Sequence, residues 1–443
     1  MVAQLVVHPA EGPLRGGVPA PPDPLLLSVA LGIAALSEGV SRLTCRAVPE
    51  AVEALRGGLG AFGVEARSES GGLVVVGRGL FGLTQPDQAL DARGVPTAAF
   101  VLSGLCAGAP FESLLVVDPL VAEEVAPLFG ERVQVTDAPD GGQTLRFLPV
   151  AQRPPGVRAP VAGARPGAKI AALLAGLRAA SVTIVREGIA SADHCERLLT
   201  RLRIPVRASA TTLELHPPRD VDALAAFELG EVGDPSAAAY LLCAAALVRD
   251  SHVTVRDVGL NPSRGALLDA FRSLGVRAGT SPRGDVLGEP VGEVSAFGAG
   301  VRGGVVGGEI GVRLGDDFVP AALLAAASER TVELSDVLPS GVWSGADSQG
   351  RDVARVVGLL RAFGLDATPT SAGLVVQGGA GRRLRATRIT TGGDHRLALG
   401  ATVLALLGDG PTVVDDVDCI ARFFPRFVGS LRALGARIEV RSE

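Results

Sequence analysis

The chain has 443 residues, of which 47% are apolar and only 4% aromatic. This length predicts two or three domains, whose cores must be built from Ala, Val and Leu. The formal net charge of -5 gives no reason to expect nucleic acid or an anionic membrane surface as a partner. The longest apolar runs are shorter than a membrane span.

The cysteines, histidines and lysine of the chain limit the kinds of functional site that it can form. The five cysteines form no C-x-x-C motif, and the five histidines form no H-x-x-x-H pair. We therefore expect reduced thiols, a cytoplasmic location and no metal or other cofactor. The sequence has no basic segment followed by an apolar stretch, so it does not indicate a signal peptide. Almost every cation is Arg, so Lys169 is the only side-chain amine that a substrate could meet.

One pattern returns six times along the chain. An Ala- and Leu-rich helix precedes a β-type run, and a second helix then ends in Leu/Phe-Gly-Val or a close variant, as in Phe271-Arg-Ser-Leu-Gly275-Val276. The copies lie roughly 70 to 90 residues apart, which suits a whole supersecondary unit rather than a solenoid repeat. In chain order, the first helices are expected at residues 25–37, 97–107, 169–179, 236–248, 319–328 and 396–407, and the following strands at 40–45, 113–117, 182–185, 253–258, 331–334 and 412–414.

The two helices of a unit differ in polarity. The first is apolar nearly all round, so we expect it to lie inside the protein. The second, for example residues 47–59, carries charged side chains on one face and should lie outside. Pro and Gly are dense at residues 13–24 and 151–166, which predicts connections there, and the alternating Gly and Val of residues 300–311 predict an edge strand.

Two of the expected buried helices begin with acidic residues. Gly233-Asp234-Pro235-Ser236 is typical of a helix start, with Asp or Ser as the cap and Pro in the first turn. Asp316 and Asp317 directly precede another apolar helix, where one of them could also be a general base if it faces a cleft. For each motif taken alone, a plain helix cap is the simpler interpretation.

A third helix start carries three ionisable residues in a row. Gly392 and Gly393 lead into Asp394, His395 and Arg396 at the beginning of an apolar helix. Free backbone N–H groups and the positive end of the helix dipole favour an anion there, and a guanidinium can bind phosphate or carboxylate with two parallel hydrogen bonds. This motif indicates a functional anion site more strongly than the other two.

The order of these motifs resembles that of one family. Gly-Asp-Pro-Ser is followed by Asn261-Pro-Ser-Arg264, then by Asp-x-x-Pro, Gly-Asp-His-Arg and Cys419-Ile-Ala-Arg-Phe-Phe-Pro425. The chain resembles the enolpyruvyl transferases, and among them the 5-enolpyruvylshikimate-3-phosphate synthases. The resemblance is strong from about residue 182 onward and weaker before it.

The resemblance implies an α/β fold, a two-lobed inside-out α/β barrel of six βαβαββ repeats with three repeats in each lobe. One lobe would hold residues 1–18 plus 229–443 and the other residues 19–228, with a cleft between them. The implied reaction transfers the enolpyruvyl group of phosphoenolpyruvate to shikimate 3-phosphate through a tetrahedral intermediate. Small anionic substrates and no cofactor, nucleic acid or membrane are expected, and the protein is expected to be a monomer.

The resemblance also implies roles for individual residues. Asp317 matches the family's catalytic Asp, and Asp394, His395 and Arg396 match its Asp-His-Arg, whose Arg binds phosphoenolpyruvate. The catalytic residues are therefore expected to be Asp317, Asp394 and His395, and the substrate-binding residues Arg396, Arg351, Lys169, Ser236, Arg93 and Arg422.

Four segments depart from the family pattern. Residues 19–23 replace a Pro-Gly-Ser-Lys-Ser segment, residues 92–99 lack the family's final Arg, residues 165–169 replace a Ser-x-Gln phosphate-binding segment, and residues 348–352 lack a Lys-Glu pair. Arg93, Arg165 and Arg351 could substitute for the lost cations. Two interpretations stay open, a divergent enzyme and a catalytically altered or inactive family member that binds or regulates. A UDP-N-acetylglucosamine enolpyruvyl transferase is disfavoured, because no cysteine here has the Pro-Gly context of that sister family.

Overall fold

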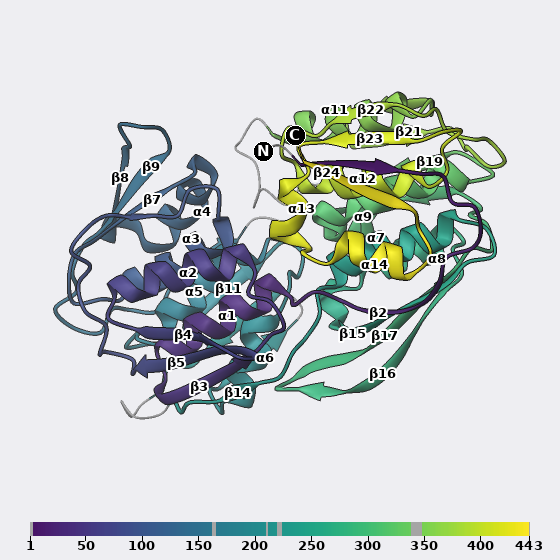
Figure 1. The fold of residues 1–443 in the computed structure, drawn as a ribbon. Helices are drawn as coiled ribbons and strands as arrows, with labels where there is room; N and C mark the ends of the chain where they lie inside the picture. The colour runs from purple at the N-terminus through teal and green to yellow at the C-terminus, as the bar shows by residue number, and fades with distance from the viewer. Residues whose placement is uncertain (1–2, 162–164, 210, 219–223, 338–347, 443) are drawn as a thin grey trace.

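A computed structural model of the chain describes residues 3–161, 165–209, 211–218, 224–337 and 348–442. Two lobes lie side by side, one coloured purple to teal and the other mainly green to yellow in Figure 1. Each lobe has its own core of buried apolar side chains. The core of lobe one comes from residues 5–20 and 237–438, and that of lobe two from residues 26–232 together with Val291.

Six four-stranded sheets, three in each lobe, share one pairing pattern in the described part of the chain, although three of them take one strand from a distant part of the sequence. In every sheet one edge strand pairs in parallel with its neighbour, and the other two pairings are antiparallel. In the sheet β10-β11-β13-β12, the chain runs β10, α5, β11, α6, β12, β13. This is a βαβαββ unit, so the predicted α/β fold with three repeats in each lobe is confirmed.

Lobe two contains three of these units. Its elements are α1 (Pro24–Ala35), β3 (Glu38–Thr44), α2 (Glu50–Ala61), β4 (Glu65–Glu69), β5 (Gly72–Arg78), β6 (Leu90–Asp91), α3 (Pro96–Cys106), β7 (Ser113–Val117), α4 (Pro119–Phe129), η1 (Gly130–Arg132), β8 (Val133–Asp137), β9 (Gln143–Phe147), β10 (Arg158–Val161), α5 (Pro166–Gly176), β11 (Thr183–Glu187), α6 (His194–Arg201), β12 (Val206–Ser209), β13 (Thr212–Leu215) and β14 (Glu228–Leu229).

Lobe one contains the other three units and both ends of the chain, so the purple N-terminal strand in Figure 1 pairs with yellow C-terminal strands. Its elements are β1 (Ala3–Val7), β2 (Arg15–Pro19), α7 (Pro235–Leu247), β15 (His252–Gly259), η2 (Pro262–Arg264), α8 (Ala266–Ser273), β16 (Ala278–Val286), β17 (Glu289–Phe297), β18 (Gly304–Val306), α9 (Gly308–Leu314), η3 (Gly315–Asp317), α10 (Phe318–Leu323), η4 (Leu324–Ala327), β19 (Val332–Leu334), α11 (Ser348–Ala362), β20 (Ala367–Pro369), β21 (Leu374–Val376), β22 (Arg388–Thr390), α12 (His395–Ala405), β23 (Thr412–Asp415), α13 (Asp418–Phe423), α14 (Phe427–Ala433) and β24 (Ile438–Ser442).

The chain crosses between the lobes at two adjacent points. The first crossing leads from β2 in lobe one to α1 in lobe two, and the second leads from β14 in lobe two to α7 in lobe one. Pro22 and Gly233 form an isolated β-bridge, which holds the two crossings together. Each crossing ends in an Asp-Pro pair, so Asp23 and Asp234 begin their helices at the joint between the lobes.

The first helix of each unit lies inside its lobe, as its apolar pattern predicts. Every residue from Leu26 to Ala35 of α1 is buried, and so is every residue from Ala237 to Leu247 of α7. Small residues permit this packing, because a Cβ atom on Gly32 of α1 would lie only 2.6 Å from a methyl group of Val101 in α3. Aliphatic side chains and glycines thus form a dense helical interior with few aromatic rings.

A hairpin of lobe one also docks on lobe two. Val291 of β17 belongs to the core of lobe two. The buried Glu289 contacts His194 of α6 at 2.8 Å, and the Asn261 amide donates to both Glu289 (3.0 Å) and Asp193 (2.7 Å). The lobes are therefore fastened along this edge as well as at the two crossings.

The structure corrects two expectations from the sequence. The predicted edge strand at residues 300–311 is a strand only over β18, because the chain then turns into α9 at Gly308, whose φ is +60°. The helix predicted at residues 319–328 is α-helical only to Leu323 and continues as the 3-10 segment η4.

The five cysteines are free, and the described residues contain no helix with the length and apolar character needed to cross a bilayer.

Candidate active site between the lobes

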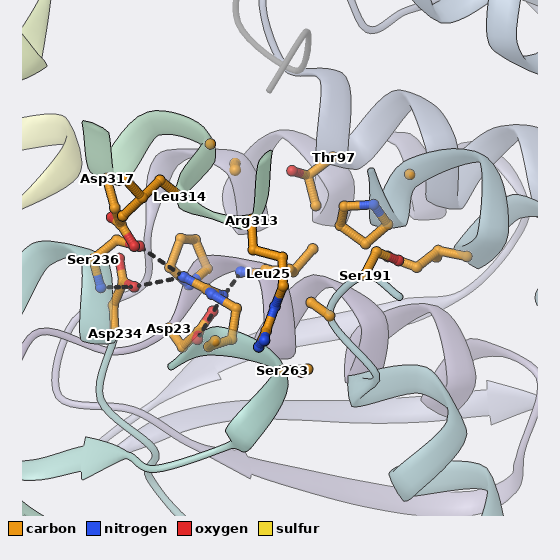
Figure 2. Close-up of a pocket in the computed structure, with 18 of the residues that line it drawn as sticks. Asp23, Leu25, Thr97, Ser191, Asp234, Ser236, Ser263, Arg313, Leu314 and Asp317 are labelled. Carbon is orange, nitrogen blue, oxygen red and sulfur yellow. Dashed lines mark hydrogen bonds and ion pairs between the residues drawn. The ribbon is translucent and has the colours of Figure 1, made fainter. Parts of the chain in front are cut away.

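Helix starts from both lobes surround a cavity of about 190 Å³. Lobe two contributes the beginnings of α1, α3 and α5 and the loop before α6. Lobe one contributes the beginnings of α7, α10 and α12, together with η2 and α9. Figure 2 shows Asp317, Asp234 and Ser236 on one side of this cavity and Thr97 and Ser191 on the other.

The start of α7 is tied to the start of α1 by one guanidinium. Asp234 caps α7 by accepting from the backbone N–H of Ser236 at 3.0 Å, and Asp23 caps α1 by accepting from that of Leu25 at 2.9 Å. Arg264 donates to Asp234 (3.2 Å), to the Ser236 hydroxyl (2.9 Å) and to Asp23 (3.4 Å). It therefore bridges the two lobes at the floor of the cavity.

Asp317 adds a third carboxylate to this cluster. It is half-buried at the end of η3, directly before α10, and its charge acts on both Arg264 and Asp234. Burial, the charge of Asp23 and the charge of Asp317 together raise the pKa of Asp234 to about 7, against the opposing charge of Arg264. Three carboxylates thus share one guanidinium, so this side of the cavity is suited to accept a proton.

The start of α12 holds a second, tightly paired guanidinium. Asp394 caps α12 by accepting from the backbone N–H of Arg396 at 2.9 Å. The Arg396 side chain donates to Asp394 (2.9 Å) and to Asp352 (3.2 Å), and Arg355 contacts Asp394 at 2.9 Å. Burial opposes ionisation of Asp394, but the hydrogen bond and charge of Arg396 outweigh it and lower its pKa.

His395 faces the cavity from the same helix start. Its ring stacks on Phe423 with 4.4 Å between ring centroids. Burial lowers the pKa of His395 to about 4, so the imidazole is neutral near pH 7. It can accept or donate a hydrogen bond there, but it adds no positive charge for an anion.

Lys169 does not line the cavity. α5 begins at Pro166, so Lys169 lies inside the first turn, and its side chain is only 1% exposed. The ammonium contacts Glu196 at 2.7 Å, Glu187 at 3.3 Å and the Ser191 carbonyl at 3.3 Å. Burial disfavours its charge, but the charges of Glu196 and Glu187 offset this and raise its pKa. In this structure Lys169 supports the loop that carries Ser191 and has no opening toward a ligand.

The other expected binding residues are dispersed. Arg93 pairs with Asp91 and with Asp140, 2.9 Å away, and Arg422 makes an exposed contact of 3.7 Å with Glu50 of the opposite lobe. Neither is among the described residues that line the cavity. The side chain of Arg351, in α11, lies outside the part of the protein that the structure describes. Of the nine residues expected from the sequence, four line the cavity together: Ser236, Asp317, His395 and Arg396. A fifth, Asp394, accepts a hydrogen bond from the Arg396 guanidinium.

Four charged cavity residues were missing from the sequence-based set, namely Asp23, Asp234, Arg264 and Arg313. Asp23 and Asp234 share the Asp-Pro helix start, so that repetition could have indicated the first. Arg313 follows residues 300–311, which were expected to form a strand. In the structure Arg313 belongs to α9, and its side chain extends from this helix into the cavity (Figure 2). It donates to the Pro262 carbonyl at 2.7 Å, and its contact with the exposed Glu309 is 3.7 Å.

These features agree with comparisons to known proteins. The sequence profile of the family described as EPSP synthase (3-phosphoshikimate 1-carboxyvinyltransferase) matches residues 151–440. A 3-phosphoshikimate 1-carboxyvinyltransferase of Desulforamulus reducens is 31% identical over 97% of this chain and 99% of its own length, and one of an Anaeromyxobacter species is 32% identical over 96% and 97%.

Solved structures show the same fold. An EPSP synthase from Acinetobacter baumannii superposes with a TM-score of 0.80 at 23% identity, covering 99% of this chain and 100% of its own. The enolpyruvyl transferase NikO from Streptomyces tendae superposes with a TM-score of 0.77 at 19% identity, covering 100% and 99%. From the family match and the full-length relatives, the chain belongs to the EPSP synthase (3-phosphoshikimate 1-carboxyvinyltransferase) family.

Proposed function

We propose that this chain transfers the enolpyruvyl group of phosphoenolpyruvate to shikimate 3-phosphate. Membership of the family supports this activity. The observation that carries it is the convergence of Asp317, Arg396 and His395 on one interlobe cavity that the N-termini of α7 and α12 also face. A proton acceptor, a guanidinium and two helix N-termini are what an addition reaction on an anionic donor needs.

The reaction has two balanced steps. The acceptor hydroxyl loses its proton and its oxygen bonds to C2 of phosphoenolpyruvate, while the methylene carbon gains a proton. The bond between C2 and the phosphate oxygen of this tetrahedral intermediate then breaks, and the methyl group loses a proton. The products are an enolpyruvyl ether and inorganic phosphate, and no cofactor is required.

The geometry supports a role for each of these residues. Asp317 takes the proton of the attacking hydroxyl, because it lies beside Asp234 and Arg264 in the one carboxylate cluster of the described cavity wall. Arg396 holds the carboxylate or phosphate of phosphoenolpyruvate, and Asp394 fixes the guanidinium through its 2.9 Å hydrogen bond. His395, which is neutral, orients the helix start rather than supplying charge.

The two lobes are proposed as the moving parts. We place their boundaries at residues 1–18 plus 229–443 and 19–228, near the two chain crossings. The exposed Arg422–Glu50 contact joins the two lobes, so opening would break this pair. One chain supplies both walls of the cavity, which supports a monomer as the functional unit, and the free thiols support a reducing, cytoplasmic location.

The decisive test is a phosphate-release assay with phosphoenolpyruvate and shikimate 3-phosphate. We expect phosphate release that requires both compounds. The alternative, a binding or regulatory protein on the same scaffold, is not favoured by the family match, but it predicts a different result. If no phosphate is released, while calorimetry detects binding of one of the compounds, the scaffold interpretation replaces the enzyme.

A further inference from the structure

The two walls of the cavity differ in charge. Among the described residues that line it from lobe two, Asp23 is the only ionisable one, and the wall otherwise presents side chains such as Leu25, Thr97, Phe100 and Ile170. The wall from lobe one holds all the lining cations that the structure describes, namely Arg264, Arg313 and Arg396. Any anion in this cavity therefore finds its cationic partners on one side.

The charge of Lys169 is already balanced by carboxylates of the same lobe. Lys169 is surrounded by Glu187 and Glu196, and all three side chains are at most 11% exposed. A phosphate that recruited this ammonium would leave two buried carboxylates without their counter-ion, which is strongly unfavourable. The backbone of the loop beside it is also committed, because the Ser191 N–H donates to Glu187 at 3.1 Å.

The arginines nearest the lobe-two helix starts are paired in the same way. Arg165, the residue before α5, contacts Glu124 at 2.8 Å, with both side chains at most 20% exposed. Arg93, just before α3, contacts Asp140 at 2.9 Å and donates to the Gly141 carbonyl at 2.9 Å. Each of these two cations has a local carboxylate partner, so neither supplies spare positive charge to a second substrate at the lobe-two helix starts.

On lobe one, the available positive charge suffices for one anionic substrate. Arg264 and Arg396 are each hydrogen-bonded to two carboxylates. Arg313 has only a carbonyl partner at 2.7 Å and the exposed Glu309 at 3.7 Å, so it is the cavity cation with the most capacity for a ligand. Phosphoenolpyruvate, with its carboxylate and phosphate, would use this capacity.

We propose that the site accepts a cyclic alcohol without a phosphate group as enolpyruvyl acceptor, with a kcat/KM less than about 30-fold below that of the phosphorylated compound. This rests on the proposed transferase function. The ring of the acceptor packs on the apolar wall of Phe100, Ile170 and Leu25, with its hydroxyl directed across the cavity toward Asp317. The step is the same balanced addition and elimination, with phosphoenolpyruvate as donor and inorganic phosphate as leaving group.

The test compares shikimate and shikimate 3-phosphate as acceptors at saturating phosphoenolpyruvate. A phosphate held by a buried cation would give the phosphorylated acceptor an advantage of about 30-fold or more in kcat/KM. We expect a smaller advantage or none. A preference of about 30-fold or more for shikimate 3-phosphate would overturn the inference and leave the transferase function standing. Absence of phosphate release with either acceptor would instead refute the transferase function, and the inference with it.

A charge-insertion variant supplies a second, independent measurement. Ala190 lines the cavity from lobe two and is exposed, so a longer side chain fits there without disturbing the core. Ala190→Arg should raise the preference for shikimate 3-phosphate at least about 10-fold, because it gives this wall its first free cation. Ala190→Met is the matched uncharged control and should leave the ratio unchanged. If both variants give the wild-type ratio, the acceptor does not lie on this wall and the inference is wrong.

Discussion

The two walls of the cavity have the same architecture but differ in the charge of the side chains that line them. Each consists of buried helices that begin at the cleft, and Pro24, Pro96, Pro166 and Pro235 stand at the first position of four of them. In lobe one the helix starts carry Asp317 and Arg396, whereas in lobe two they carry Leu25 and Thr97. The comparison teaches that one repeat fold can carry walls of different charge, since the described lining of lobe two has a single ionisable side chain and that of lobe one has several.

The largest expected effect comes from removing the proton acceptor of lobe one. Asp317→Ala should reduce kcat by about two to four powers of ten, the usual contribution of a positioned general base. Steady-state assays of phosphate release would measure it, with Asp317→Asn as the variant that keeps the side-chain volume. Wild-type turnover in either variant would show that another group takes the proton.

Replacing Lys169 should mainly affect stability rather than turnover, because this side chain has a structural role in lobe two. Lys169→Ala leaves Glu187 and Glu196 buried without a counter-ion and should lower the free energy of unfolding by about 3–5 kcal/mol. Denaturant unfolding would measure this loss, and Lys169→Arg is the charge-conserving control. An alanine variant as stable as the wild type, but with a greatly raised KM for phosphoenolpyruvate, would mean that Lys169 binds substrate after all.

Arg313 tests whether lobe one holds the donor. Because it has one carbonyl partner and lies on the cavity, its truncation should cost binding and little stability. Arg313→Ala should raise the KM for phosphoenolpyruvate about 10- to 100-fold, the value of hydrogen bonds to a charged group. The KM of the acceptor should stay within a factor of about two. A variant that changes the acceptor KM alone would place the two substrates the other way round.

A smaller effect is expected from the titration of Asp234 at the joint between the lobes. Its folded-state pKa is raised to about 7, so the folded protein binds this proton more tightly than the unfolded chain does. The resulting stability is present at acidic pH and is lost as the pH rises through about 7. The Tm of the wild type should therefore fall more between pH 6 and pH 8 than that of Asp234→Asn, which keeps a capping side chain. Equal changes in Tm would contradict this assignment.

The sequence predicted the repeat because local signals carry it. Apolar periodicity and helix caps depend on neighbouring residues, so the β7 strand was predicted with its observed bounds and Asp234 and Asp394 cap their helices. Ion pairs across the fold are not local. The partners of Lys169 lie 18 and 27 residues away in the chain, and a helix that starts three residues earlier than expected turned this side chain inward.

Arg313 escaped prediction for a related reason. The Gly and Val residues before it alternate as in a strand, but the positive φ of Gly308 allows the chain to turn into α9. Likewise, Arg264 belongs to the Asn-Pro-Ser-Arg motif, while its three partners come from both lobes. Tertiary context therefore determined which arginines reach the cavity.

The central claim is that the lobe-one wall performs enolpyruvyl transfer, and the most direct measurement is identification of the product. The wild-type protein should be incubated with phosphoenolpyruvate and each acceptor, and the mixture analysed by mass spectrometry together with phosphate release. We predict an enolpyruvyl ether of the acceptor, formed in equal amount with inorganic phosphate and nearly absent with Asp317→Ala. Unchanged substrates, or phosphate released without an ether product, would contradict the account.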